Sequence, residues 1–224
     1  MTVLDLAGRT PAQKQGLLSQ LVVPRPIAMI TSLDASGGLN VAPFSYYMPV
    51  CGEPPLIAVT IGAVREATAA PKDTWTNLQR TGEFVVNVTT AAMAEHIEAV
   101  AREYPAGYDE TRVSGWKTID SQAVSVPSLE ISPARLECRV WESIDRGDQS
   151  NCFSGVHIVL AEVVCITVDD RITTTSPTGE VRIDPSRVDV VGRMGFPWFV
   201  QARSDSLFPQ DRIAYADIDV GPPG

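Results

Sequence analysis

The sequence is short of the residues that several common kinds of active site require. Only two of its 224 residues are histidine, and its four cysteines include no Cys-x-x-Cys pair, so a zinc site is poorly supplied. The nucleotide-binding patterns Gly-x-x-x-x-Gly-Lys-Ser/Thr and Gly-x-Gly-x-x-Gly and the hydrolase pattern Gly-x-Ser-x-Gly are also missing. These absences argue against metal catalysis, the standard nucleotide-binding folds and serine hydrolases.

Positive charge and long apolar runs are scarce as well. The chain has 18 Lys and Arg against 27 Asp and Glu, a net charge of -9, which disfavours a nucleic-acid partner because phosphates need excess cation. No apolar run approaches the ~20 residues of a membrane span. The segment 1–10 carries Asp5 and Arg9 and lacks the apolar core of a signal peptide. We therefore expect a cytoplasmic protein with no membrane partner.

What the chain does contain is a series of short apolar or alternating runs separated by turns. These runs predict strands over 27–33, 39–43, 56–61, 84–88, 136–141 and 156–168. Helices are predicted over 11–20, after an N-cap at Asp73 or Thr74 to about Arg80, and over 90–102. The pattern is typical of a mainly β protein with peripheral helices, and we expect one barrel-type domain over 1–224, with its core at 15–200 and a tail at 201–224.

Several details of this prediction can be compared with a structure. Glu137 and Arg139 are expected to point outward from their strand, and the strand 156–168 to be interrupted at Ala161–Glu162. Two segments, 103–115 and 173–185, are expected to be irregular loops. The first is long enough to cover a site, because long structureless loops are uncommon without a function.

Small polar residues gather where strands and helices are predicted to end. Lys72 and Thr74 flank a predicted helix start, whose free N–H groups suit a phosphate; an ordinary cap beside a solvated lysine is the alternative. The stretch 40–47 places Ser45 in a proline turn backed by aromatics, which suits a ligand with an anionic end and a flat apolar body, or a simple turn over the core. Hydroxyls and a glycine end two further strands, at Thr31-Ser32 and Thr60-Ile61-Gly62.

Taken in order, these stretches resemble the flavin reductase-like, FMN-binding split-barrel proteins, a group that includes flavoredoxin. The resemblance covers about 15–200. It is carried by Pro24-Arg-Pro-Ile-Ala-Met-Ile-Thr-Ser32, Asn40-Val-Ala-Pro-Phe-Ser45, Lys72-Asp-Thr-x-x-Asn77, Thr81-Gly-Glu-Phe-Val-Val-Asn87, Pro133-Ala-Arg-Leu-Glu-Cys138, His157-Ile-Val-Leu-Ala-Glu-Val163 and Gly192-Arg-Met-Gly195.

The resemblance implies a six-stranded split β-barrel that forms a homodimer and binds FMN close to the subunit interface. It assigns cofactor binding to Thr31, Ser32, Asn40, Ala42, Ser45, Thr60, Ile61, Gly62, Lys72, Thr74 and Asn77, with Lys72 and Thr74 at the phosphate. Asn77 could instead pin the local backbone. The sequence does not decide whether Arg25 and Arg193 contact the phosphate or form a salt bridge across the dimer.

The family also implies an activity, which is the transfer of hydride from NADH or NADPH to flavin, with a monooxygenase or another electron acceptor as partner. Short flavin reductases carry a Gly-Asp-His block near flavin and nicotinamide, whereas this chain has Gly155-Val156-His157. His157 is therefore either such a contact or a core residue. The loss of the acidic member slightly favours the alternative of a flavoredoxin-like FMN electron carrier with little NAD(P)H turnover. The third hypothesis, beside the reductase and the electron carrier, is a barrel that binds no flavin.

Overall fold

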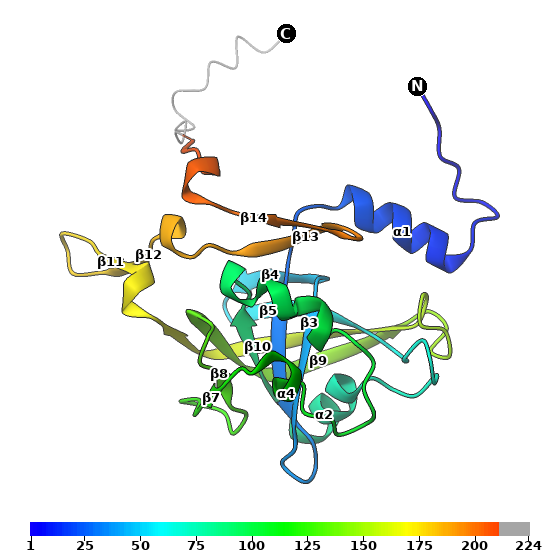
Figure 1. The fold of residues 1–224 in the computed structure, drawn as a ribbon, viewed down its shortest axis with the longest axis horizontal. Coiled ribbons are helices and arrows are strands. Elements are labelled where there is room, and N and C mark those ends of the chain that lie inside the picture. The colour runs from blue at the N-terminus through cyan, green and yellow to red at the C-terminus, as the bar shows by residue number, and fades with distance from the viewer. Residues whose placement is uncertain (211–224) are drawn as a thin grey trace.

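The computed structural model describes residues 1–210, and positions 211–224 of the expected tail lie outside them (Figure 1). The strands are β1 (Arg25–Pro26), β2 (Ala28–Leu33), β3 (Leu39–Phe44), β4 (Tyr47–Gly52), β5 (Pro55–Gly62), β6 (Glu83–Val88), β7 (Thr118–Ile119), β8 (Ser128–Leu129), β9 (Ala134–Arg146), β10 (Val156–Val168), β11 (Thr173–Thr175), β12 (Val181–Ile183), β13 (Val191–Gly195) and β14 (Trp198–Gln201). The α-helices are α1 (Pro11–Leu21), α2 (Asp73–Thr81), α3 (Ile97–Val100) and α4 (Thr111–Ser114). Short 3₁₀ turns cover Ala91–His96, Asp170–Ile172, Pro185–Arg187 and Ser204–Ser206. None of the helices within 1–210 has the length and apolar character to cross a membrane.

The two longer helices start and stop where their end residues dictate. Thr10 caps α1 with a capping box, in which its hydroxyl accepts from the Gln13 N–H and the Gln13 side chain accepts from the Thr10 N–H. Helix α2 begins one residue off the prediction, because Lys72 is its N-cap and makes no side-chain capping bond. It ends at Gly82, whose φ of 66° is the left-handed conformation that glycine adopts without strain. The expected helix over 90–102 is a 3₁₀ turn followed by α3.

Seven antiparallel strands form the main sheet, in the order β3-β2-β6-β9-β10-β5-β4. The prediction of a mainly β protein with peripheral helices is confirmed, whereas the expected six-stranded barrel differs from this sheet. The additional strand is β4, which turns back after Tyr46 and pairs Tyr47 with Val59 of β5. Pro49 lies inside β4, and proline suits an edge strand because it has no N–H to donate. Within 1–210 no pairing of β3 with β4 closes the sheet.

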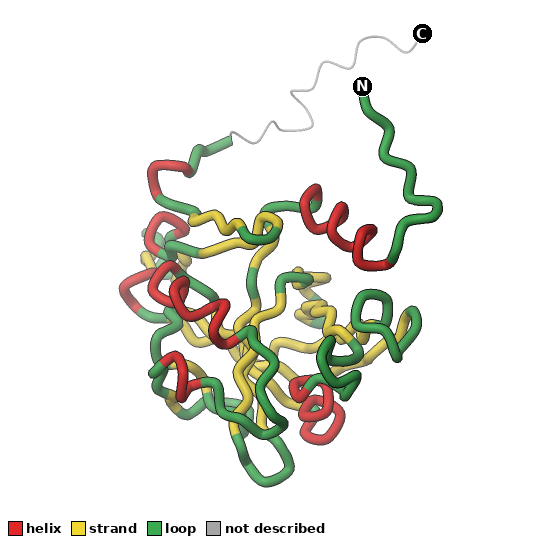
Figure 2. The backbone as a smooth tube through the Cα atoms, turned by 45° about the vertical axis from the view of Figure 1, so that its right-hand side comes forward, coloured by secondary structure: helices red, strands yellow, loops and turns green. Residues whose placement is uncertain are grey.

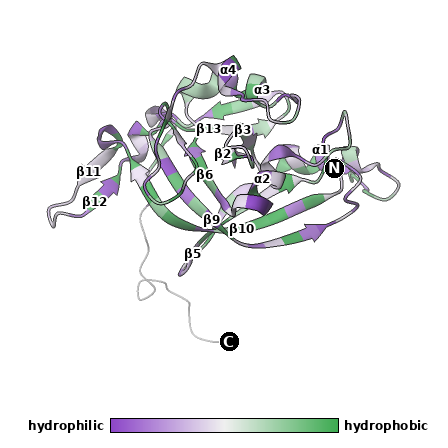
Figure 3. Cartoon of the chain, turned by 90° about the horizontal axis from the view of Figure 1, so that it is seen from below, coloured by the Kyte–Doolittle hydropathy of each residue, from purple (hydrophilic) through white to green (hydrophobic). Residues whose placement is uncertain are grey.

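The main core lies inside the curve of this sheet. Four strand spacings separate β2 from β5, ~19 Å in a flat sheet, yet Ile30 of β2 and Val59 of β5 belong to one buried cluster. The sheet must therefore curl, and α2 adds Trp75 and Leu78 to the cluster it encloses. Figure 3 shows apolar and polar residues alternating along the curved strands.

A second cluster lies on the other side of β2 and β3, under the segment 91–116. It contains Met29 and Val41 from the strands together with Met93, Ile97 and Val100, as the predicted helix face required. Figure 2 shows the helices at the outside of the strand framework. This cluster fixes the segment 97–106 beside the edge of β3, where it forms one wall of the groove described below.

Three sequence-based expectations are wrong in detail. Glu137 is fully buried because the chain around Gln122 folds over it, and its carboxylate accepts the backbone N–H groups of Gln122 and Ala123. Strand β10 is continuous, and the expected interruption is a register shift between Leu160 and Ala161. The segment 173–185 contains the paired strands β11 and β12, joined by a turn at Gly179.

Candidate functional site

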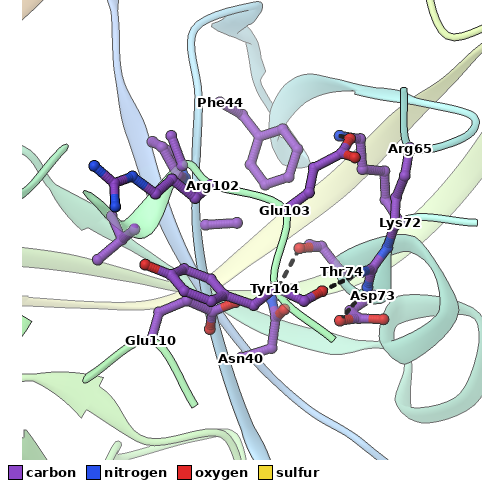
Figure 4. A pocket seen from close by; sticks show the side chains of 14 residues that line it. Asn40, Phe44, Arg65, Lys72, Asp73, Thr74, Arg102, Glu103, Tyr104 and Glu110 are labelled. Carbon is purple, nitrogen blue, oxygen red and sulfur yellow. Dashed lines mark hydrogen bonds and ion pairs between the residues drawn. The ribbon is translucent and has the colours of Figure 1, made fainter. Parts of the chain in front are cut away.

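Three adjoining cavities form a groove along the segment 97–106. The middle cavity, about 100 Å³, shares Arg65 and Glu103 with a cavity of about 440 Å³ on one side. On the other side it shares Pro43 and Ala101 with a cavity of about 210 Å³. The opposite wall of the groove consists of β3 and the start of α2. The segment 103–115, expected to be an irregular loop, contains the short helix α4, and its residues Glu103, Tyr104 and Glu110 line this hollow (Figure 4).

One end of the groove holds the cations Lys72 and Arg65, each paired with a carboxylate, and is called its cationic end below. Lys72 is the N-cap residue of α2, and its Nζ is 3.3 Å from Oε1 of Glu103. Arg65 pairs with Asp73 at 2.5 Å and also donates to the Tyr104 carbonyl. Figure 4 shows the Arg65, Lys72 and Glu103 side chains gathered at this end. Two cations and two carboxylates thus meet here, with Lys72 half-exposed and accessible to a ligand.

A buried set of neutral polar side chains holds α2 against the strands at this end. The amide of Asn40 donates to the Thr74 hydroxyl at 2.9 Å and to the Ser32 hydroxyl at 3.3 Å. The amide of Asn77 donates to the same Ser32 oxygen at 3.0 Å. Because these bonds join β2, β3 and α2, they fix the position of Lys72 relative to β3.

The other end of the groove combines a hydroxyl with apolar surface. Ser45 and Phe199 line it, and Arg193 lies over the Phe199 ring at 4.3 Å while pairing with Glu98. Arg25 donates to the Ser45 hydroxyl at 3.4 Å and is otherwise engaged by the carbonyls of Ser19 and Val22.

Glu110 brings a buried carboxyl group to the middle of the groove. Its Oε2 accepts the Val41 N–H at 2.8 Å. Burial raises the pKa of Glu110 to about 7, and the nearby negative charges of Asp73 and Asp109 act in the same direction. Near neutral pH this carboxyl is poised between its neutral and its charged form.

The structure brings together about half of the residues assigned by the resemblance. Asn40, Ala42, Ser45, Lys72 and Thr74 line the groove, and Ser32 and Asn77 lie directly behind its wall.

The other four assigned residues lie elsewhere. Thr31 points to the opposite side of β2 from Ser32 and accepts from the Asn87 amide. Ile61 belongs to the core, and Thr60 and Gly62 alternate with it on the outer side of β5. Gly62 is close to the cationic end, because a Cβ there would be 3.9 Å from Cε of Lys72.

His157 does not line the groove. Its ring stacks on Trp75 of α2 with centroids 3.8 Å apart, and its Nδ1 is 2.7 Å from Oδ1 of Asp145. Asp145 is the residue paired with His157 on β9, so the neighbouring strand supplies a carboxylate that the sequence lacks at Val156. No linear motif could reveal this partner, because it depends on the β9–β10 register.

Four residues of this region were missed by sequence reasoning. They are Arg65, Glu103, Glu110 and Asp145. The length of the predicted loop 103–115 pointed toward Glu103 and Glu110 only as members of that segment. A loop without periodicity does not indicate which of its side chains turn inward.

Comparison with known proteins agrees with this description. The family described as "Flavin reductase like domain" matches residues 19–178. An uncharacterized protein of Deinococcus radiodurans is 31% identical over 219 residues, 96% of this chain and 91% of that protein. The crystal structure of nitrilotriacetate monooxygenase component B from Bacillus cereus is 27% identical with a TM-score of 0.80, over 95% of this chain and 98% of that one. The crystal structure of Pseudomonas fluorescens 2-nitrobenzoate 2-nitroreductase NbaA is 24% identical, with a TM-score of 0.78 over 99% of each chain, and has the same fold as this chain. This chain belongs to the flavin reductase-like domain family.

Proposed function

We propose that this protein binds FMN along the groove and transfers hydride from NADH or NADPH to the flavin. The observation that carries the proposal is the division of one groove into an end that holds Lys72 and Arg65 and an end that holds the Ser45 hydroxyl and the Phe199 ring beside the Arg193–Glu98 pair. FMN has the same division, with a phosphate at one end and a flat ring system at the other.

The donors of the groove fit this cofactor. Lys72 would hold the phosphate together with the Thr74 hydroxyl and the free N–H groups at the start of α2, as a helix N-terminus does for anions. The Ser45 hydroxyl and the backbone around Ala42 would face the polar edge of the ring. When bound, the flavin supplies the hydride- and electron-transfer chemistry, so the chain needs no catalytic triad of its own. What the chain contributes is binding, orientation and fixed dipoles.

The middle cavity of about 100 Å³ is smaller than the ~300 Å³ or more of typical cofactor sites. A flavin would therefore lie partly open along the groove, where a second subunit could cover it. We infer a homodimer in which this happens. Edge strand β4 exposes Met48 and Val50, and β14 exposes Trp198 at 71% of its surface, which supports a contact between copies.

Similarity to component B of a monooxygenase supports a monooxygenase as the electron acceptor. The missing acidic residue at position 156 slightly favoured the carrier alternative, which the family resemblance also allows. Asp145 provides a carboxylate for His157 from the next strand, which removes that argument. The position of His157 beneath Trp75 supports a packing role for its ring rather than direct contact with flavin.

The test of the proposal is an absorption spectrum of purified protein supplied with FMN, recorded without oxygen before and after addition of NADH or NADPH. We expect bound flavin whose visible band bleaches rapidly with at least one of the two nicotinamides. A band that persists would indicate an electron carrier reduced by another protein. Protein that binds no flavin would contradict the proposal as a whole.

Lys72→Ala is expected to weaken FMN binding by about tenfold to thirtyfold, the effect of losing a charge-assisted phosphate contact. Riboflavin has no phosphate, so its affinity should change by less than about twofold. Quenching of flavin fluorescence measures both dissociation constants, and Lys117→Ala, at an exposed lysine, is the matched control. Equal losses for FMN and riboflavin would remove Lys72 from the phosphate site.

A further inference from the structure

The cationic end of the groove already holds a carboxylate from the chain itself. Oε1 of Glu103 accepts the Glu66 N–H at 2.8 Å, and Oε2 accepts the Ala67 N–H at 3.0 Å. Oε1 also lies 3.3 Å from Nζ of Lys72. Burial acts to raise the pKa of Glu103, but the bonds from Ala67 and Glu66 and the charge of Lys72 outweigh it, and the pKa lies below its ordinary value. Glu103 is therefore ionised at neutral pH.

The donors that Glu103 occupies are those that a phosphate prefers. Two successive backbone N–H groups beside an ammonium form a compact anion-binding set. The Glu103 carboxylate satisfies this set, and a phosphate that approaches Lys72 meets a negative charge only a few ångströms away (Figure 4). At such a distance like charges repel strongly where water is partly excluded. The phosphate must therefore displace the carboxylate or bind beside it at a cost.

We infer that Glu103 is a specificity-determining residue that weakens the binding of phosphate-bearing flavin relative to flavin without a phosphate. The inference rests on the proposed FMN site. Its consequence is that FMN is held loosely enough to exchange, which suits a reductase that passes reduced flavin to a partner. Glu103 makes this contribution through charge, because its carboxylate competes for Lys72 and the two N–H groups.

A purely structural role for Glu103 makes a different prediction. The same hydrogen bonds pin the segment 103–106 to the loop at Glu66 and Ala67, and loss of this pin would loosen the groove wall for any ligand. Loosening would alter the binding of FMN and riboflavin alike. Competition for the anion site would alter the binding of FMN alone.

The test is Glu103→Gln, which removes the charge and keeps a side-chain oxygen to accept a backbone N–H. We expect FMN to bind about fivefold to tenfold more tightly, in line with the loss of one competing charge at a half-exposed site. Riboflavin affinity should stay within about twofold. Flavin fluorescence quenching gives both constants, and inorganic phosphate should compete with FMN more effectively in the variant. Glu95→Gln, at a strongly exposed glutamate, is the control and should leave both affinities unchanged.

The outcomes separate this inference from the function on which it rests. If wild-type protein binds FMN and Glu103→Gln leaves its affinity unchanged or weaker, the inference is overturned while the flavin site stands. Parallel changes for FMN and riboflavin would also overturn it, in favour of the structural role. A wild-type protein that binds neither flavin would overturn the proposed function as well. A thermal melt checks that the variant folds, and Glu103→Ala, which also lacks the charge, must shift FMN affinity in the same direction.

Discussion

Replacing Trp75 with alanine is expected to lower the free energy of unfolding by about 3–5 kcal/mol, the usual cost of emptying a large aromatic site in a core. Trp75 is only 8% exposed and belongs to the main core cluster. Its indole also covers the His157 ring, so alanine would leave both a cavity and an uncovered imidazole. Urea unfolding followed by circular dichroism measures the change.

Two further variants make this prediction specific to packing. Trp75→Phe keeps an aromatic face against His157 and should cost only about 1–2 kcal/mol, because it leaves a smaller cavity. Trp141→Ala removes an exposed indole from β9 and should change stability by less than about 0.5 kcal/mol. Similar losses for Trp75→Ala and Trp141→Ala would mean that α2 is not anchored to the core through Trp75.

The elements around the site that could be predicted are those governed by local rules. The hairpin of β2 and β3 follows from two apolar runs around a glycine-rich turn, and the end of α2 follows from Gly82. The ordered family motifs then placed Asn40, Ser45 and Lys72 in one region, and the structure puts all three along one groove.

What could not be predicted depends on contacts between distant segments. The alternation of apolar and polar residues along β9 predicted that Glu137 is exposed. The local sequence does not show that the chain near Gln122 folds back and buries it. The same is true of Asp145, which meets His157 only through strand register. Thr31 and Ser32 show the limit of motif transfer, because adjacent residues of a strand face opposite sides and only Ser32 contacts the polar side chains behind the groove wall.

The pocket carboxyl Glu110 gives the second large effect, which depends on pH. Its pKa is about 7 in the folded chain against an ordinary value of 4.5, so between these values the folded state binds more protons than the unfolded state. Stability is therefore greatest below about pH 4.5 with respect to this group and falls as the pH rises through 7. The full difference corresponds to roughly 3 kcal/mol.

Glu110→Gln replaces the carboxyl with a neutral group that can still accept the Val41 N–H. We expect this variant to be more stable than wild type by roughly 3 kcal/mol at pH 8 and by less than about 1 kcal/mol at pH 5, where Glu110 is neutral in the folded chain but already mostly charged in the unfolded chain. Urea unfolding at both pH values measures the two differences, with Glu95→Gln as the exposed control. A gain of the same size at both pH values would show that it does not come from ionisation of Glu110.

The predicted gain would mean that wild type bears the cost of a buried negative charge at the centre of its groove. Since this charge adds to the repulsion of an anionic ligand, FMN binding to wild type should also weaken as the pH rises through 7, and this dependence should be reduced in Glu110→Gln.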